Sequence, residues 1–230
     1  MRSKAKAKPQ KILILGGTAE ARTLAAELMA QGHAVTTSLA GRTVDPILPE
    51  GAVRIGGFGG ADGLAAYLRD EGFERMIDAT HPFARRISEN AIKAAAISGV
   101  PLEQRLRPRW QKLPGDRWRS VTSLDAAADA LSSGSTVFLA LGRQYLDAFV
   151  SRSDCRFIIR MVDPPETRLA FPDHLPVLGK PSSDPDREAD LFTAHGVTHL
   201  VCRNSGGPAG YAKIIAARKL ALPVIMVERD

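Results

Sequence analysis

The sequence predicts an α/β protein made of two lobes, each with a parallel sheet and helices packed on its faces. Short apolar runs that end in Gly, Ser, Thr or Asp alternate with segments of helical period, which is the pattern of repeated βα units. This alternation occurs in two sets along the 230 residues. Residues 105–120 follow neither period and are rich in Pro, Trp and Arg, so we place the domain boundary within them.

The first lobe, residues 1–112, contains the first set of alternating segments. Five short apolar runs predict strands at residues 12–15, 34–38, 53–55, 76–79 and 102–104. Helices are expected between them at residues 19–31, 61–71 and 83–98. Gly32 and Gly99 end two of these helices, because glycine readily adopts the left-handed conformation that follows a last helical turn.

The second lobe, residues 113–230, contains the second set. Its strands are expected at residues 136–141, 156–162, 200–202 and 224–227. Its helices are expected at residues 124–131, 144–151, 186–195 and 210–220. Both lobes are therefore expected to be Rossmann-like, with a cofactor cleft between them.

The composition is that of an ordinary globular protein, with 44% hydrophobic and 24% charged residues. The sequence has no run of about 20 apolar residues that would form a membrane helix. The basic N-terminus leads straight into a strand and lacks the pattern of a secretory signal. Cys155 and Cys202 are the only cysteines, and their spacing supports neither a disulfide framework nor a zinc site. We therefore expect a soluble, cytoplasmic protein without a bound metal.

The net charge of +6 leaves three interpretations open. The densest basic cluster is interleaved with Trp110 and Trp118 and consists of Arg105, Arg107, Arg109, Lys112, Arg117 and Arg119. This cluster is either a solvated linker face or a clamp for a polyanionic small molecule. Nucleic-acid binding is the third interpretation, and the distribution of the charge argues against it.

Residues 11–22 have the pattern of a nucleotide cradle. A strand, a turn at Gly16, Gly17 and Thr18, and the start of a helix follow one another. The glycines let the backbone approach a diphosphate, and the first amides of the helix favour its negative charge. Ala21 replaces the final glycine of the usual pattern, so a merely structural turn stays open as the alternative.

Ser38 and Arg42, after the second strand, favour NADPH over NADH. An NAD site usually places Asp or Glu here to accept hydrogen bonds from the ribose hydroxyls, and this chain has neither. A hydroxyl and a guanidinium suit a 2′-phosphate instead. The alternative is a surface arginine after a turn.

Two further segments of the first lobe are candidate cofactor contacts. Gly57 and Phe58 belong to the glycine-rich residues 56–60, where Phe58 either packs on a ligand ring or plugs the loop against its own lobe. Thr80 and His81 follow the fourth strand, at the edge where open α/β sheets bind ligands. His81 is also the only candidate for proton transfer, although the sequence shows no orienting partner. The alternative for His81 is a helix cap or a hydrogen-bonded spacer.

The second lobe repeats this arrangement of polar residues at strand ends. Asn204, Ser205, Gly206 and Gly207 follow a buried strand and are expected to face the cofactor, or else form a simple glycine-rich turn. Lys213 lies on the next helix and is a candidate substrate contact. Arg160 is expected either to bind a substrate carboxylate or to form an ion pair within the lobe.

The order of these motifs resembles the precorrin-6A reductase family. The motifs are residues 15–20, 38–42, 54–60, 78–84 and 204–207, and they span both lobes. The resemblance implies hydride transfer from NADPH to precorrin-6A, giving precorrin-6B in cobalamin (vitamin B12) biosynthesis. It implies that residues 16–18 hold phosphates, that Ser38 and Arg42 hold the 2′-phosphate, and that Thr80 and His81 contact the inner half of the cofactor. Arg203 and Gly210 depart from the family pattern, which commonly has Lys and Thr there.

The implied substrate is a polycarboxylate tetrapyrrole, which a basic, aromatic cleft would concentrate and orient. Other enzymes of the pathway are candidate partners through substrate channelling, whereas nucleic acid and membrane are not expected as partners. A cobalt-precorrin-6A reductase and a non-catalytic NADP-binding sensor remain alternatives. A short-chain carbonyl reductase is excluded, because none of Tyr67, Tyr145 and Tyr211 is followed four residues later by the required Lys.

Overall fold

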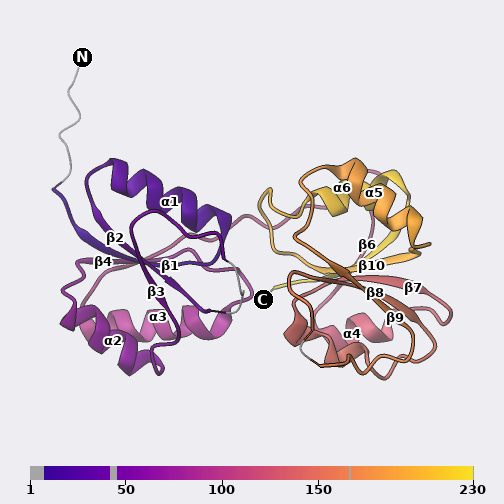
Figure 1. Ribbon diagram of the computed structural model, residues 1–230, viewed down its shortest axis with the longest axis horizontal. Coiled ribbons are helices and arrows are strands. Elements are labelled where there is room, and N and C mark those ends of the chain that lie inside the picture. Colours follow the sequence, from indigo (N-terminus) through magenta and orange to yellow (C-terminus); the bar gives the residue numbers. More distant parts are fainter. Residues whose placement is uncertain (1–7, 42–45, 166, 230) are drawn as a thin grey trace, which may run out of the picture. The chain divides into compact units, whose positions relative to one another are not determined.

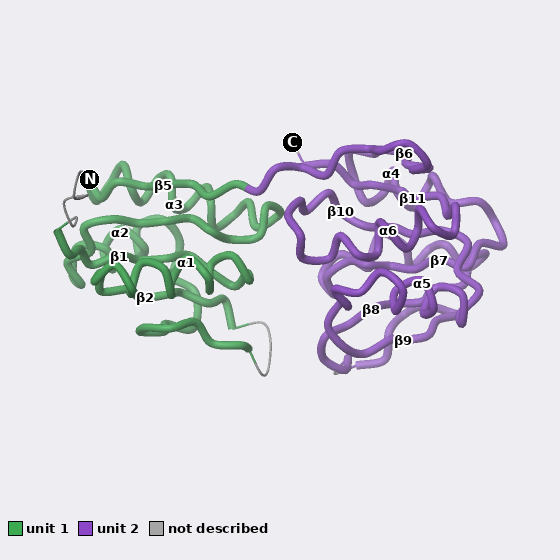
Figure 2. The backbone as a smooth tube through the Cα atoms, turned by 90° about the horizontal axis from the view of Figure 1, so that it is seen from above, with its two compact units in different colours: residues 1–106 green, residues 107–230 purple. Residues whose placement is uncertain are grey.

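The computed structural model describes residues 8–41, 46–165 and 167–229. The chain divides into two compact units, residues 1–106 and 107–230 (Figure 2). This division lies before the predicted one at residue 112. The reason is that Trp110 is buried in the core of the second unit and hydrogen-bonded to residues of that unit, so its segment belongs there.

The first unit contains a five-stranded parallel sheet in the order β3-β2-β1-β4-β5. Its strands are β1 (Lys11–Leu15), β2 (Ala34–Leu39), β3 (Ala52–Ile55), β4 (Arg75–Asp78) and β5 (Leu102–Gln104). Its helices are α1 (Ala19–Ala30), α2 (Ala61–Asp70) and α3 (Arg85–Ser98). Helix α1 covers one face of the sheet, and α2 and α3 cover the other (Figure 1).

Strand β1 shows why the unit folds this way. Ile12 and Ile14 pack in the core on the α1 face, whereas Leu13 and Leu15 pack in the core beneath α2 and α3. A strand that is buried on both faces has a continuous run of apolar residues, which is typical of strands in parallel sheets. Gly32 and Gly99 have φ of 92° and 77°, which confirms the predicted helix ends.

The second unit contains a six-stranded parallel sheet in the order β6-β11-β10-β7-β8-β9. Its strands are β6 (Arg117–Val121), β7 (Thr136–Ala140), β8 (Arg156–Met161), β9 (His174–Leu178), β10 (His199–Arg203) and β11 (Pro223–Val227). Its helices are α4 (Leu124–Asp129) on one face and α5 (Pro185–Ala194) and α6 (Ala212–Lys219) on the other (Figure 1). The two parallel sheets confirm the predicted α/β, Rossmann-like fold class.

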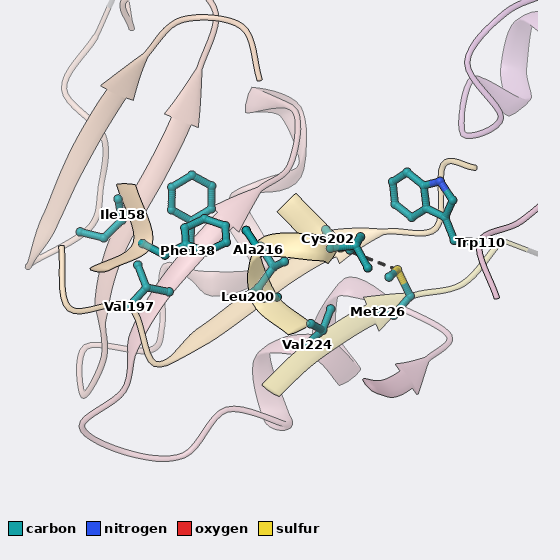
Figure 3. Packing of buried hydrophobic residues seen from close by; sticks show 12 residues of the cluster. Trp110, Phe138, Ile158, Val197, Leu200, Cys202, Ala216, Val224 and Met226 are labelled. Atoms are coloured by element: carbon teal, nitrogen blue, oxygen red, sulfur yellow. Dashed lines mark hydrogen bonds between the residues drawn. The ribbon is translucent and has the colours of Figure 1, made fainter. Parts of the chain in front are cut away.

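One core cluster packs the sheet of the second unit against α5 and α6 (Figure 3). Phe138 and Phe192 pack against each other in this cluster, with ring centroids 4.8 Å apart. Cys202 lies beside Met226, with their sulfur atoms 3.7 Å apart. Trp110 lies at one end of the cluster, so the segment that precedes β6 is part of this core.

Three elements of the second unit differ from the sequence-based prediction. Strands β6 and β9 were not predicted, and both are edge strands with exposed residues. The predicted helix at residues 144–151 is wrong, because two 3₁₀ turns stand there, Arg143–Tyr145 and Asp147–Phe149. The spacing of three between the buried Leu146 and Phe149 suits the threefold repeat of a 3₁₀ helix. None of the described helices combines the length and the apolar character needed to cross a bilayer.

Candidate functional site

The carboxyl ends of four strands bring the predicted cofactor residues of the first unit to one edge of the sheet. Chain order runs outward from β1 to β3 and then returns to β4 on the other side of β1. The strand order therefore reverses between β1 and β4, and open α/β sheets bind ligands at this reversal. Gly16 follows β1 and Thr80 follows β4, so both lie beside it.

The turn after β1 brings the chain close to the end of β2. The Gly16 N–H donates to the Ser38 carbonyl oxygen over 2.9 Å, and a Cβ at position 16 would lie 2.6 Å from the Thr37 side chain. Gly17 has a φ of 99°, and no heavy atom lies within 4 Å of where its Cβ would be. Glycine is thus required at 16 for close packing and at 17 for the backbone conformation, and the space over Gly17 is open.

Thr18 has structural tasks that the sequence did not reveal. Its hydroxyl accepts a hydrogen bond from the Ala21 N–H over 3.0 Å, which caps α1, and donates to the Ala79 carbonyl oxygen over 2.9 Å. It therefore joins the turn after β1 to the end of β4, across the reversal of strand order. Since both roles of the hydroxyl are used, the backbone amides at residues 17–20 are the groups that this turn offers to an anion.

Asp78 is a polar group at this edge to which the sequence analysis gave no role. Its Oδ1 accepts hydrogen bonds from the Thr80 N–H and hydroxyl, at 3.1 and 2.6 Å. Its Oδ2 is buried and has no hydrogen-bond partner among the described residues. A buried acceptor without a donor is costly, which is one reason to expect a ligand donor here. The signal in the sequence was a carboxylate at the end of a buried strand.

His81 is held by the segment between β4 and α3. Its Nδ1 accepts a hydrogen bond from the Phe83 N–H over 3.3 Å, so the proton of the neutral ring is on Nε2. The His81 carbonyl oxygen also accepts from the Ala84 N–H at 2.7 Å. These bonds orient the ring and agree with the interpretation of His81 as a hydrogen-bonded spacer. His81 does not cap α3, because that helix begins at Arg85 and has no side-chain cap.

The glycine-rich loop 56–60 is fixed by the arginine that precedes it. Arg54 donates to the carbonyl oxygens of Gly56 and Gly57 at 2.7 and 2.8 Å, and its guanidinium lies 3.9 Å from the Phe58 ring centroid. Phe58 also packs on Tyr67 at 5.3 Å. Of the two interpretations of Phe58, the structure favours the one in which it packs against its own unit. No heavy atom lies within 4 Å of where a Cβ of Gly57 would be, so the space beside this residue is open.

Ser38 is buried at the end of β2, in register with Leu15 of β1. This register places it at the edge that carries the other cofactor candidates. Arg42, its predicted companion at the 2′-phosphate, lies outside the residues that the structure describes.

In the second unit, Asn204 holds the segment around Trp110 rather than presenting its side chain to a ligand. Its Oδ1 accepts from the Trp110 N–H at 2.8 Å, and its Nδ2 donates to the Trp110 carbonyl oxygen and to Glu228, both at 3.1 Å. The indole N–H donates to the Gly207 carbonyl oxygen at 2.7 Å. A Cβ at position 206 would collide with the Pro108 carbonyl oxygen. Residues 204, 206 and 207 thus form a clamp on the chain at 108–110, and we call these residues the Trp110 clamp.

Arg160 and Glu188 form a buried ion pair. One terminal nitrogen of Arg160 lies 2.7 and 2.9 Å from the two carboxylate oxygens, and Glu188 is 1% exposed. Glu188 also accepts a hydrogen bond from the Ser182 N–H at 2.8 Å, which ties the loop before α5 to the pair. Of the two interpretations of Arg160, the structure favours the ion pair within the unit.

Lys213 is a second buried cation nearby, in the first turn of α6. Its Nζ donates to the Gly210 carbonyl oxygen at 2.6 Å and lies 4.9 Å from the Trp110 ring centroid. Burial lowers the pKa of Lys213. As for a metal site, within the described ranges no three His, Cys, Asp or Glu side chains lie close enough together to hold a metal ion.

The model of one protein family, described as "Precorrin-6x reductase CbiJ/CobK", matches residues 11–230. The chain belongs to the precorrin-6x reductase family. This confirms the resemblance that the ordered motifs indicated.

Individual relatives agree with this membership in the family. A precorrin-6A reductase of Sinorhizobium sp is 49% identical over 222 residues, which cover 95% of this chain and 85% of that protein. A precorrin-6A reductase of Rhodobacter capsulatus is 44% identical over 220 residues, with 95% and 88% covered. A solved structure described as "CobK precorrin-6A reductase" superposes with a TM-score of 0.93 at 43% identity, covering 96% of this chain and 88% of the other. Members of the precorrin-6x reductase family thus share both units of this chain.

Proposed function

We propose that this chain catalyses the NADPH-dependent reduction of precorrin-6A to precorrin-6B in the biosynthesis of cobalamin. The observation that carries the proposal is the match of 95% of the chain to relatives named precorrin-6A reductase. A second observation supports it: the first unit has the strand order and the glycine turn of a dinucleotide-binding domain.

The residues of the first unit fit a dinucleotide. The space over Gly17 is open to a phosphate, and the amides at residues 17–20 face it with the positive end of the α1 dipole. The Asp78 oxygen without a partner suits a hydroxyl or amide donor. When bound, NADPH supplies the hydride.

We assign the other cofactor contacts in the first unit by their place along the same edge. Ser38 and Arg42 would hold the 2′-phosphate. Gly57 would contact the neighbouring half of the cofactor through its backbone, and Phe58 would contact it through the edge of its ring. Thr80 and His81 would contact the inner half of the cofactor. The His81 Nδ1 accepts a hydrogen bond from the Phe83 N–H, which orients the ring. We assign His81 to binding of the cofactor.

In the second unit we propose that Lys213 contacts the substrate and that Arg160 positions its surroundings through Glu188. Asn204, Gly206 and Gly207 act through Trp110. We assign the direct contact with a ligand to Ser205, whose hydroxyl donates to the Arg203 carbonyl oxygen at 3.3 Å. We place the reaction in the cytoplasm, where neighbouring enzymes of the pathway would supply and remove the labile tetrapyrrole.

Oxidation of NADPH by purified protein and precorrin-6A, followed at the nicotinamide absorbance, tests the proposal. We expect substrate-dependent oxidation with NADPH preferred over NADH. Arg42→Ala should weaken NADPH binding about 10- to 100-fold and leave NADH binding unchanged, because it removes a charged donor to the 2′-phosphate. Arg69→Ala is the matched control, since Arg69 is an exposed arginine in the last turn of α2.

Two other outcomes of this assay would point to a different function. Oxidation with cobalt-precorrin-6A alone would identify the cobalt-bearing tetrapyrrole as the substrate. Tight NADPH binding without oxidation by either substrate would contradict the reductase and favour a sensor of NADP.

A further inference from the structure

We propose that Arg54 is a positioning residue for cofactor binding, which holds the glycine-rich loop 56–60 so that the backbone amides of Gly57 and Phe58 face the cofactor. The inference rests on the proposed function, which assigns Gly57 and Phe58 to the cofactor. Its basis is the set of contacts that Arg54 makes within the first unit.

The loop is attached to the unit at both of its ends. Arg54 lies on the edge strand β3, in register with Ser38 of β2, and the loop begins two residues later. The Gly56 N–H donates to the Leu39 carbonyl oxygen at 2.9 Å, which fixes the first residue of the loop to the sheet. Further along, the Phe58 carbonyl oxygen lies against Gly63 of α2. The peptide groups between these two points need a partner of their own.

The glycines make this part of the chain costly to order. Gly56 and Gly60 have φ of 112° and 99°, in the left-handed region. Glycine loses more conformational freedom on ordering than any other residue. A cofactor that had to order the loop itself would bind more weakly for that reason, whereas a loop that is ordered beforehand avoids the loss.

The guanidinium of Arg54 orders the two peptide groups at the start of the loop. One terminal nitrogen donates to the Gly56 carbonyl oxygen at 2.7 Å, and the other donates to the Gly57 carbonyl oxygen at 2.8 Å. In a trans peptide, the carbonyl group and the following N–H point in opposite directions. The N–H groups of Gly57 and Phe58 therefore point away from Arg54. Among the described residues, no group accepts a hydrogen bond from either N–H.

Aromatic rings hold the guanidinium in turn. It lies 3.9 Å from the Phe58 ring centroid and 5.1 Å from that of Tyr67 on α2. Tyr67 packs on Phe73, with ring centroids 5.5 Å apart, in the core beneath α2 and α3. A planar guanidinium stacks on aromatic faces and donates to two oxygens at once, whereas the ammonium group of lysine is a point charge. The planar fork, rather than the charge alone, is thus what this position uses.

Titration with NADPH and with NADH, followed by nicotinamide fluorescence, tests the proposal. Arg54→Lys keeps the charge and loses the planar fork, so it should bind both cofactors about 10-fold more weakly. The ratio of the two affinities should stay the same, because the loop amides serve both cofactors equally. Arg42→Ala should change that ratio instead. Arg69→Ala is the control, since Arg69 is exposed in the last turn of α2, and it should bind as the original chain does.

Arg54→Ala gives a second measurement, by chemical rescue. Guanidinium chloride at tens of millimolar, far below denaturing concentrations, should restore part of the lost NADPH affinity by occupying the vacated space. Sodium chloride at the same concentration should not. If Arg54→Ala fails to give the far-ultraviolet dichroism of the original chain, Arg54→Lys decides by its two affinities alone.

Three outcomes would overturn the positioning role. They are unchanged affinities in Arg54→Lys, a loss in either variant that is confined to NADPH, and a restoration by sodium chloride as large as that by guanidinium. The second would mean that Arg54 contacts the 2′-phosphate directly. Absence of NADPH binding by the unaltered chain would overturn the proposed function as well. Failure of the proposed function alone is seen as absent NADPH oxidation with either tetrapyrrole, while the effects of Arg54 on binding persist.

Discussion

At the scale of single residues, Thr18 shows how a side chain in a nucleotide turn can serve the fold. Its hydroxyl caps α1 and bridges to Ala79, and it is 7% exposed. A capping hydroxyl satisfies an amide that would otherwise lack a partner at the helix start. Thr18 thus keeps the ends of β1 and β4 together while leaving the amides beside it for an anion.

Replacement of Thr18 by Val should lower the free energy of unfolding by about 1–2 kcal/mol, as the loss of a cap does. Urea denaturation measures this change. Thr23→Val is the control, since Thr23 is exposed in the middle of the same helix, and its replacement should change stability by less than about 0.5 kcal/mol. Equal midpoints for both variants would show that the bridge contributes nothing.

Asn204 marks the limit of prediction from sequence at this scale. The pattern of a polar residue and two glycines after a buried strand indicated a ligand-facing loop. The partner of Asn204 is Trp110, 94 positions earlier in the chain, and a local pattern holds no information on such a contact. The candidate residues of the first unit were more predictable, because the parallel strand order alone brings them to one edge.

At the scale of elements, Gly63 explains how α2 approaches the glycine-rich loop. A Cβ at position 63 would collide with the Phe58 carbonyl oxygen, so helix and loop touch through a residue without a side chain. Glycine within a helix usually costs about 1 kcal/mol relative to alanine. Its presence inside α2 therefore has a packing reason.

Gly63→Ala should accordingly destabilise the protein by about 1–3 kcal/mol, the opposite of the helix-propensity effect, because the loop must move. The same displacement should weaken NADPH binding. Gly57→Ala serves as the control for stability, since nothing lies within 4 Å of its Cβ position. A gain of stability in Gly63→Ala would contradict the contact between helix and loop.

The two strands that the sequence did not predict, β6 and β9, are the edge strands of the second sheet. Strand β9 contains Pro176, which removes a backbone donor and is tolerated at the edge of a sheet. Strand β6 is exposed along most of its length and lies within a stretch rich in charge. Central strands carry an apolar run because both faces are covered, whereas the apolar residues of β6 are interrupted by charge and those of β9 by Pro176.

At the scale of the whole molecule, the two units are expected to divide the work of binding. The cofactor candidates of the first unit lie along the ends of β1 to β4, and the buried cations of the second unit lie around Lys213. The interrupted periodicity at residues 105–120 indicated the division between the units, and the observed boundary after residue 106 lies within this stretch. The exact residue was not predictable, because the burial of Trp110 depends on the folded core.

Hydrogen exchange of the full chain, read by mass spectrometry, should resolve this division of binding. NADP⁺ should slow exchange at residues 17–20 and 56–60 by about 10-fold or more, since a bound phosphate and ribose stabilise these loops. Uroporphyrin III, a stable tetrapyrrole octacarboxylate, should slow exchange at the start of α6 instead, where we place the substrate contact Lys213. Protection by NADP⁺ that is strongest at residues 204–207 would contradict the assignment of the Trp110 clamp to a positioning role.

The strand order of the second unit has a consequence for how the chain is made. The first strand of this sheet, β6, pairs with β11, about 100 residues further along, in the register of Arg117 with Pro223. During synthesis on the ribosome the first unit can complete its sheet while β6 still lacks its neighbour. The second sheet must wait until residues 223–227 have emerged, and its apolar faces are open to chaperones or to aggregation in the interval.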